Sequence, residues 1–397
     1  MLNVLALAVF VALGPSQPIS PPAPPATVIT PAPSLAPAVE SLKERLDRFV
    51  ATSGVPGATL AVVWPDGRSC RVASGLADRE TSAPMPADAR MMSGSIGKSF
   101  VAATALLLAE QNRLDLDAPL STILGQEPWF ARLPNAADLT LRSLLNHTSG
   151  IPEHVTRPDF VQAIHASPDR SWTASELLAF TLDRPALFPV GKGWSYADTN
   201  YIVAGAAIEK VTSRPYNDLV VELWLKPVDL RETSPVTSAH LPGIVPGHTG
   251  EADPFFGDAR QVGLDGRYPI NPQFEWTGGG LLTSSHDLAH WMCALYTDDL
   301  LKSASRTQML DAQPARTGPG DRYGLGTQVL RTPHGDAWGH SGFFPGYVSL
   351  AFYFPELGLA AAAQFNTSEF ARLGGMRQLL SDAASLAHDA VQPAKAP

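Results

Sequence analysis

The sequence has little cysteine, no long basic run, and no apolar run long enough to cross a bilayer. Only Cys70 and Cys293 occur among 397 residues, so no disulfide framework supports the fold, and both lie in segments that favour buried, inert thiols. The formal net charge is −9, which is not the electrostatic footprint of a protein that binds nucleic acid or an anionic membrane surface. These absences favour a small-molecule or peptide substrate and no nucleic acid.

The first residues are typical of an export signal followed by a linker. The segment 2–13 is apolar apart from one asparagine, so we predict that residues 1–14 hold the hydrophobic region of a signal peptide and that the chain has no stable membrane span. Nine prolines fall within residues 15–37, which predicts a linker before a globular domain over 38–390. We expect an exported protein, periplasmic or secreted, in which the N-terminal segment is either cleaved or kept as a tether.

The globular part has strand patterns at both ends and helical patterns between them. Residues 39–50 carry apolar side chains at helical spacing, and 370–390 predict a closing helix. Residues 59–73 and 347–365 each predict a hairpin, because two apolar runs flank a proline-containing turn. We therefore predict an α/β (α+β) fold, with one antiparallel sheet built from the N- and C-terminal segments, flanked by helices, and a mostly helical second lobe within about 95–330. A cleft between sheet and lobe is the natural place for a site.

A serine and a lysine three residues apart begin an apolar helix. Ser95 and Lys98 share one helix face, and an almost wholly apolar run over 101–109 continues the helix. The amine can accept the hydroxyl proton, and the free N–H groups at the helix N-terminus favour negative charge on the serine oxygen. This pattern predicts covalent acyl-enzyme catalysis, with a helix cap and a solvated lysine as the structural alternative.

Three other segments carry residues suited to a site. Tyr196 and Asp198 lie two apart on a tight connection before a helix predicted from 202 onward. A histidine-containing segment, 338–343, leads into the last hairpin and is expected to form an edge strand along the cleft. Residues 141–152 predict a helix that a glycine and a proline end. Taken alone, the tyrosine and the histidine favour structural roles.

Together these segments resemble the penicillin-recognising serine hydrolases, in the beta-lactamase-related branch that holds class C β-lactamases, D-Ala-D-Ala carboxypeptidases and related esterases. The family motifs S-x-x-K, Y-x-N and K-T-G or H-x-G appear in order as Ser95–Lys98, Tyr196–Asp198 and His340–Gly342. Residues 144–151 resemble its L-L-x-H-T-S-G segment, and 278–289 resemble its G-G-G-L-x-S-T-x-x-D-L block. Five ordered blocks make this resemblance strong, where one motif would be weak.

The resemblance implies a role for each of these residues. Ser95 is the nucleophile, and Lys98 and Tyr196 share the work of general base and general acid. The backbone N–H groups of Ser95 and Phe343 form the oxyanion hole. No cofactor and no metal are expected. The predicted substrate-binding residues are Asp198, His340, Ser341 and Gly342.

Two departures from the family pattern bear on the substrate. The third motif has His340 where β-lactamases have lysine, so we rank β-lactamase activity below carboxypeptidase and esterase activity. Asp198 stands where many members have asparagine, and a carboxylate cannot donate a hydrogen bond to a substrate carbonyl. Its charge also favours protonated Lys98, which shifts the base role toward Tyr196. We predict an exported serine hydrolase, most similar to a D-Ala-D-Ala carboxypeptidase or an esterase.

The sequence is also compatible with other functions and contains other candidate sites. A class C-like β-lactamase and a weakly catalytic cell-wall peptide-binding protein remain as alternative functions. Ser285, His286 and Asp287 are adjacent and cannot align as a triad, so they predict a helix start. His286 and His290 have the spacing of a zinc site but lack the usual glutamate and an evident third ligand. No G-x-S-x-G elbow is present, which argues against an ordinary α/β-hydrolase.

Overall fold

The computed structural model describes residues 35–250, 253, 255–256, 266–297, 300–318 and 320–392. The predicted signal region, 1–14, and nearly all of the predicted linker lie outside the described residues. The first helix, α1, begins at Ala36, two residues before the predicted start of the domain at position 38. The proline at its second position fits the first helical turn, where the missing N–H has no partner to lose.

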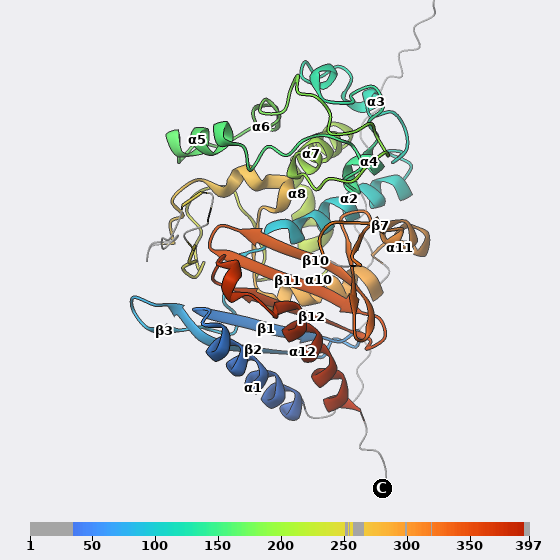
Figure 1. Cartoon of the computed structure of the whole chain (residues 1–397). Coiled ribbons are helices and arrows are strands. Elements are labelled where there is room, and N and C mark those ends of the chain that lie inside the picture. Colours follow the sequence, from blue (N-terminus) through green and yellow to red (C-terminus); the bar gives the residue numbers. More distant parts are fainter. Residues whose placement is uncertain are drawn as a thin grey trace, which may run out of the picture.

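Both ends of the chain contribute to one large antiparallel sheet (Figure 1). Within the described residues, nine strands pair in the order β3-β2-β1-β12-β11-β10-β9-β8-β7. The N-terminal strand β1 pairs with the C-terminal strand β12, with Ala58 opposite Phe365, which confirms the predicted sheet of both termini. The strands are β1 (Gly57–Val63), β2 (Ser69–Asp78), β3 (Ala83–Pro84), β7 (Gln313–Pro314), β8 (Arg322–Tyr323), β9 (Gln328–Thr332), β10 (Gly335–Phe344), β11 (Tyr347–Phe354) and β12 (Leu359–Phe365).

The two predicted hairpins are present. Gly67 turns the chain between β1 and β2 with φ +83°, and Gly358 turns it between β11 and β12 with φ +63°, a backbone region that glycine enters without steric cost. Four consecutive alanines of β12, residues 360–363, are fully buried. Helices cover both faces of this central strand, so an unbroken run of small apolar residues suits it better than alternation.

Helices pack on both faces of the sheet (Figure 1). α1 (Ala36–Ser53) and α12 (Met376–Val391) contact each other and one face, and α10 (Ser285–Thr297) packs on β1, β11 and β12 from the other side. Leu42 and Leu46 of α1 and Leu379 of α12 are fully buried. Burial of each leucine side chain contributes about 1.5–3 kcal/mol to the stability of the fold. The predicted first and last helices are confirmed, although α12 begins six residues after position 370.

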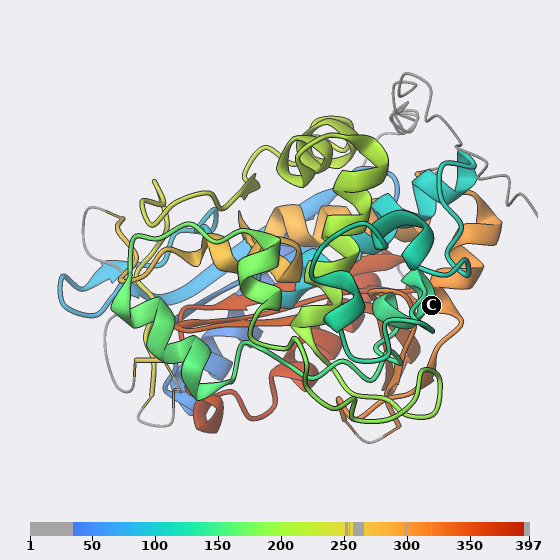
Figure 2. The same ribbon diagram turned by 90° about the horizontal axis from the view of Figure 1, so that it is seen from above.

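The middle of the chain forms a mostly helical lobe, which Figure 2 shows lying over the strands. Three short strands form a small second sheet in the order β4-β6-β5. The remaining elements are β4 (Met91–Met92), β5 (Ser234–Pro235), β6 (Leu281–Thr283), η1 (Gly94–Gly97), α2 (Lys98–Glu110), α3 (Ser121–Leu124), η2 (Phe130–Arg132), α4 (Leu141–Leu145), α5 (Pro158–Ala166), α6 (Ala174–Leu178), α7 (Asp198–Thr212), α8 (Tyr216–Val220), η3 (Val221–Leu225), η4 (Pro272–Glu275), α9 (Trp276–Gly279), α11 (Ser303–Leu310) and η5 (Phe370–Arg372).

Two helix boundaries differ from the sequence prediction. α7 begins at Asp198 rather than at 202, because the Glu153 carboxylate accepts a hydrogen bond from the Asp198 N–H at 2.5 Å and satisfies the first turn. α4 ends at Leu145, before the glycine and proline that were expected to end it, because His147 has a left-handed backbone with φ +63°. Neither the contact of Glu153 nor the backbone conformation of His147 can be predicted from the spacing of apolar residues along the chain.

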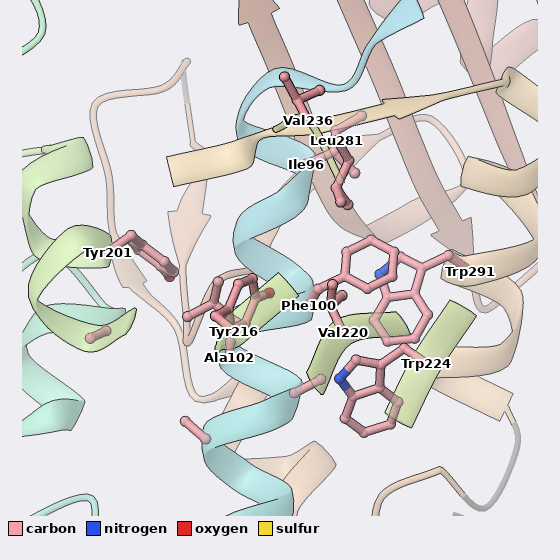
Figure 3. Packing of buried hydrophobic residues seen from close by; sticks show 14 of the residues in the cluster. Ile96, Phe100, Ala102, Tyr201, Tyr216, Val220, Trp224, Val236, Leu281 and Trp291 are labelled. Carbon is pink, nitrogen blue, oxygen red and sulfur yellow. The ribbon is translucent and has the colours of Figure 1, made fainter. Parts of the chain in front are cut away.

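Helix α2 runs through the centre of the larger core cluster (Figure 3). Phe100 on α2 stacks on Trp291 with ring centroids 3.9 Å apart. The buried indole N–H of Trp291 donates to Ser99 Oγ, and that of Trp224 donates to Thr104 Oγ1, each at 2.8 Å. Every residue of α2 up to Leu108 is buried, so the helix that carries the predicted nucleophile is fixed on all sides.

No helix among the described residues combines the length and the apolar character needed to cross a bilayer.

Candidate active site

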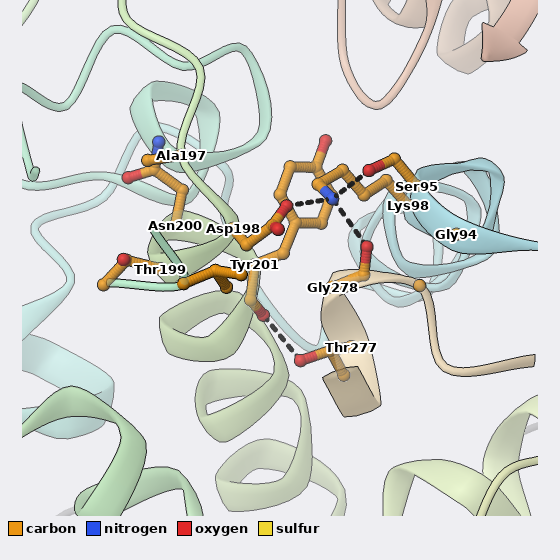
Figure 4. Close-up of polar contacts among 12 residues, drawn as sticks. Gly94, Ser95, Lys98, Ala197, Asp198, Thr199, Asn200, Tyr201, Thr277 and Gly278 are labelled. Atoms are coloured by element: carbon orange, nitrogen blue, oxygen red, sulfur yellow. Dashed lines mark hydrogen bonds and ion pairs between the residues drawn. The ribbon is translucent and has the colours of Figure 1, made fainter. Parts of the chain in front are cut away.

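Ser95 lies on η1, where the buried helix α2 begins. Lys98 is the first residue of α2 and is fully buried. Its Nζ donates hydrogen bonds to Ser95 Oγ at 2.9 Å and to the Gly278 carbonyl oxygen at 2.5 Å, and it forms an ion pair with Asp198 (Figure 4). An ammonium group has three protons, so these three acceptors satisfy it. The predicted serine and lysine are therefore in direct contact.

Nearby carboxyl groups keep the Lys98 amine protonated. Burial lowers the pKa of Lys98, but the Asp198 carboxylate, with smaller contributions from Tyr196 and Glu275, raises it above its ordinary value. Burial raises the pKa of Asp198, and the Lys98 ammonium opposes that increase. The resting site therefore holds a Lys98–Asp198 ion pair.

Tyr196 lies just before α7, with its ring against Lys98. The Lys98 Nζ is 5.0 Å from the ring centroid, and the His147 ring packs on the tyrosine at a centroid distance of 4.2 Å. Burial raises the pKa of the Tyr196 phenol, whereas the Lys98 charge and the nearby Ser95 hydroxyl oppose this increase. The structure thus brings the three predicted catalytic side chains together.

The third motif lies on β10, a strand that has paired neighbours on both sides only at Trp338 and Gly339. Among the described strands, β9 pairs with β10 from Gly335 to Gly339, whereas β11 pairs with it from Trp338 to Phe344. Beyond Gly339, β10 packs against η1 instead. The predicted edge strand is therefore correct for residues 340–344, whereas Trp338 and Gly339 have a strand on each side.

Glycines let the backbones of β10 and η1 touch. A Cβ atom on Gly342 would lie 1.9 Å from the Ser93 carbonyl oxygen. Gly94 has φ +53°, and a Cβ atom there would lie 2.6 Å from the Phe343 backbone nitrogen. Any larger side chain at either position would force the strand and the nucleophile turn apart.

Two backbone N–H groups flank the nucleophile. The Ser341 N–H donates to Gln328 Oε1 at 3.1 Å, away from β11. Hydrogen-bonding directions alternate along an antiparallel strand, so the Phe343 N–H points to the same side, toward η1. The Ser95 N–H lies in the first turn of η1 and has no partner within that helix. This geometry suits the predicted oxyanion hole of Ser95 and Phe343.

His340 lies in the site but is only 1% exposed. Its Nδ1 contacts the Ser341 carbonyl oxygen and its Nε2 lies 2.8 Å from the Tyr323 hydroxyl. A carbonyl only accepts, so Nδ1 carries the proton and Nε2 accepts from Tyr323. Burial, together with the Lys98 charge, lowers the pKa of His340 to about 3. Both ring nitrogens are occupied, so this neutral imidazole offers a substrate no free donor or acceptor.

Two acidic residues near Lys98 were missed by the sequence analysis. Glu153 follows the glycine-proline stop and caps α7, and Glu275 ends η4, just before the Gly278 that binds Lys98. Burial and the Asp198 charge raise the pKa of Glu275 to about 8. Neither residue stands in a recognised motif. An acidic residue beside a glycine-rich block was the only signal available.

One cluster away from these motifs has metal-ligand chemistry. Ligand atoms of Glu232, His286 and Asp287 lie within 4.8 Å of one another, and α10 begins at Ser285, as predicted. Arg71 is ion-paired with Glu232, and Asp287 accepts the Glu232 N–H at 2.8 Å. Because protein donors and an arginine already engage these carboxylates, the cluster is a poor cation site, and we assign it no ligand.

Comparison with known proteins gives related sequences over most of the chain. A model of the Beta-lactamase family matches residues 42–384. Esterase EstB of Burkholderia gladioli is 28% identical over 66% of this chain and 72% of its own length. Penicillin-binding protein 4* of Bacillus subtilis is 25% identical over 70% of this chain but only 60% of its own length.

Solved structures align with a larger share of this chain than these two sequences do. A D-stereospecific amidohydrolase from Streptomyces sp. is 28% identical, with a TM-score of 0.70 over 90% of this chain and 99% of that one. D-amino acid amidase from Ochrobactrum anthropi SV3, in complex with L-phenylalanine amide, is 26% identical, with a TM-score of 0.76 over 89% of this chain and all of that one. The predicted fold is therefore confirmed.

Proposed function

The chain is a serine hydrolase of the Beta-lactamase family, and we propose that it hydrolyses small esters and amides, D-Ala-D-Ala-type peptides included, through an acyl-enzyme on Ser95. The observation that carries this proposal is the buried Lys98 Nζ, 2.9 Å from Ser95 Oγ. The names of related proteins, an esterase, a penicillin-binding protein and amide hydrolases, support ester and amide substrates.

In the proposed acylation, Ser95 Oγ attacks the carbonyl carbon of the substrate while its proton passes to the general base. The carbonyl oxygen becomes an oxyanion between the N–H groups of Ser95 and Phe343, where one donor contributes about 3 kcal/mol of transition-state stabilisation. The tetrahedral intermediate then collapses: the bond from carbon to the leaving oxygen or nitrogen breaks, and the proton moves to that atom. Water repeats the sequence and frees Ser95.

We assign the base to Tyr196 in its deprotonated form. Lys98 is surrounded by three acceptors and paired with Asp198, so its amine has no lone pair to offer. The Lys98 charge lowers the pKa of the phenol relative to an equally buried phenol without it. Lys98 then orients Ser95 and stabilises the phenolate, and the fraction of phenolate sets the rate at low pH.

Two other functions are less favoured by this site. A β-lactamase is less favoured, because the third motif carries a neutral, buried His340 in place of a lysine that would bind a substrate carboxylate. A binding protein with weak catalysis is also less favoured, because the serine, lysine and tyrosine all retain contact.

The test is to incubate the purified protein with a fluorescent penicillin and, separately, with p-nitrophenyl acetate. We expect ester turnover and a mass increase on the peptide that contains Ser95, and we expect Ser95→Ala to abolish both. A folded wild-type protein that shows neither turnover nor adduct would support the binding-protein alternative instead. Rapid turnover of cephalosporins, at rates above those for esters and D-Ala-D-Ala peptides, would favour the β-lactamase.

We also propose that the protein acts outside the cytoplasm, which is supported by the apolar segment 2–13 and the proline-rich tract 15–37. Cell fractionation with antibody detection tests this. Recovery of the protein solely with cytoplasmic markers would contradict it.

A further inference from the structure

Three carboxyl groups converge beside the Lys98 ammonium. Asp198 is ion-paired with Lys98. The Asp198 N–H donates to Glu153 Oε2 at 2.5 Å, which fixes the Glu153 carboxylate at the start of α7. A Cβ atom on Gly278 would lie 3.5 Å from Glu275 Oε1 and 3.7 Å from the Asp198 Cβ, so Glu275 approaches Asp198 across this glycine. We call Glu153, Asp198 and Glu275 the acidic pocket.

The three acids differ in their hydrogen-bond and ion-pair partners. Asp198 is ion-paired with Lys98. The Oε1 atom of Glu153 lies 3.2 Å from Nδ1 of His154, and the Glu153 carboxylate accepts hydrogen bonds from backbone N–H groups. Glu275 is only 5% exposed, yet within the described part of the chain its carboxyl forms no hydrogen bond and no ion pair. A buried carboxyl without a partner is costly to the fold, and it persists at sites where a ligand completes it.

The acidic pocket is within reach of a substrate attached to Ser95. The Lys98 ammonium contacts both the Asp198 carboxylate and Ser95 Oγ. In an acyl-enzyme made from an α-amino acid, the amino nitrogen is three covalent bonds from the same Oγ atom. The side chains of Glu153 and Asp198 keep 22% and 15% of their surface exposed, so both carboxylates remain in contact with solvent.

We propose that the acidic pocket binds a protonated amino group on the acyl part of the substrate, so that the natural substrates are amides, esters or peptides of an amino acid whose α-amino group is free. This inference rests on the proposed acyl-enzyme and names its substrate class. The ammonium forms no covalent bond. It donates hydrogen bonds to the carboxylates, and Glu275 releases its proton to solvent as the cation enters. Acylation of Ser95 then proceeds as described above.

This substrate class is narrower than the proposed function, because it makes N-acylated peptides and esters poorer substrates than those with a free amino group. An amide nitrogen carries no charge and has at most one proton to donate, so it would leave the carboxylates unpaired. Charge-assisted hydrogen bonds are about twice as strong as neutral ones. The pocket should therefore discriminate by charge between a free and an acylated amino group.

The experiment compares two matched substrates, alanine p-nitroanilide and N-acetylalanine p-nitroanilide, each in the D and the L form. We expect wild-type kcat/KM to be higher for the free amine by about 10- to 100-fold in the preferred enantiomer, the effect of one or two charge-assisted hydrogen bonds. Glu275→Gln and Glu153→Gln should each reduce this ratio toward one, mainly through KM for the free amine. A variant that is merely damaged would lose both activities together and keep the ratio.

The matched control is Glu209→Gln. Glu209 is half-buried, and its carboxylate accepts the Tyr216 N–H at 2.7 Å on a different part of α7. We expect the ratio and the activity to stay at the wild-type values in this variant.

The outcomes separate the two proposals. Hydrolysis of p-nitrophenyl acetate through Ser95, together with a ratio near or below one in the wild type, overturns the acidic pocket and leaves the hydrolase intact. A wild-type ratio that both variants preserve also overturns it. A folded wild type that hydrolyses none of these compounds and acquires no label on Ser95 overturns both proposals.

Discussion

The Nζ atom of Lys98 lies 2.9 Å from Ser95 Oγ, and both residues belong to one continuous helical turn. The lysine reaches the serine without leaving the core, because its side chain is fully buried. Its charge is balanced by Asp198, which comes from the start of another helix, α7. Activity and stability are therefore linked through a single ammonium group.

Replacing Lys98 with methionine should affect both properties. Loss of the ammonium that orients Ser95 and stabilises the Tyr196 phenolate should reduce kcat for p-nitrophenyl acetate by about 10²- to 10⁴-fold. The unpaired Asp198 should also lower the free energy of unfolding by about 3–5 kcal/mol, measured by urea denaturation. The double variant Lys98→Met/Asp198→Asn should recover most of the stability but none of the activity. Wild-type turnover in a folded Lys98→Met protein would contradict the assigned role.

Asp198→Asn should shift the pH profile of catalysis. The Asp198 carboxylate raises the pKa of both Lys98 and Tyr196, so its removal lowers both values. The rise of kcat/KM with pH should then occur at lower pH than in the wild type. Asp117→Asn is the control, since Asp117 pairs with Arg142 instead and should leave the profile in place. An unchanged profile in Asp198→Asn would show that this charge does not govern the base.

Gly342→Ala should open the oxyanion hole. The new Cβ would lie 1.9 Å from the Ser93 carbonyl oxygen, so β10 must move away from η1 and carry the Phe343 N–H with it. We expect kcat to fall by about 10²- to 10³-fold, the effect of losing one such donor. Gly374→Ala is a suitable control, because nothing lies within 4 Å of a Cβ there. Equal activity of the two variants would place the oxyanion elsewhere.

His340 should make the fold sensitive to acid. Its pKa in the folded protein is about 3, against an ordinary value of 6.5, so the unfolded chain takes up the proton first. Stability should therefore fall as the pH drops from about 6.5 toward 3, by at most about 1.4 kcal/mol per pH unit for this one group. Urea denaturation across this range measures the slope. His340→Gln should flatten it, and an identical slope would rule out His340 as a source.

The elements with strong local patterns were predictable from the sequence. The run 347–354, the turn, and the run 359–365 match β11 and β12 residue for residue, because apolar composition and turn chemistry act over a few neighbours. The start of α7 was not predictable, since it depends on Glu153, 45 residues earlier.

The same reason explains which site residues were missed. Ser95, Lys98 and Tyr196 stand in recognisable motifs, whereas Glu275 matters only because the fold places it near Asp198. The protonation state of His340 could not be predicted from the sequence either, because it depends on burial and on the contact with Tyr323. Spacing along the chain records neither kind of contact.

The pairing of β1 with β12 also affects how the protein must fold. Ala58 meets Phe365 across this pair, so the first strand to leave the ribosome has no permanent neighbour on that side until almost the whole domain has been synthesised. Closing so long a loop is slow, and an unpaired strand edge invites aggregation in the meantime. Nascent chains that stop before β12 should therefore depend on chaperones, however complete their catalytic helices are.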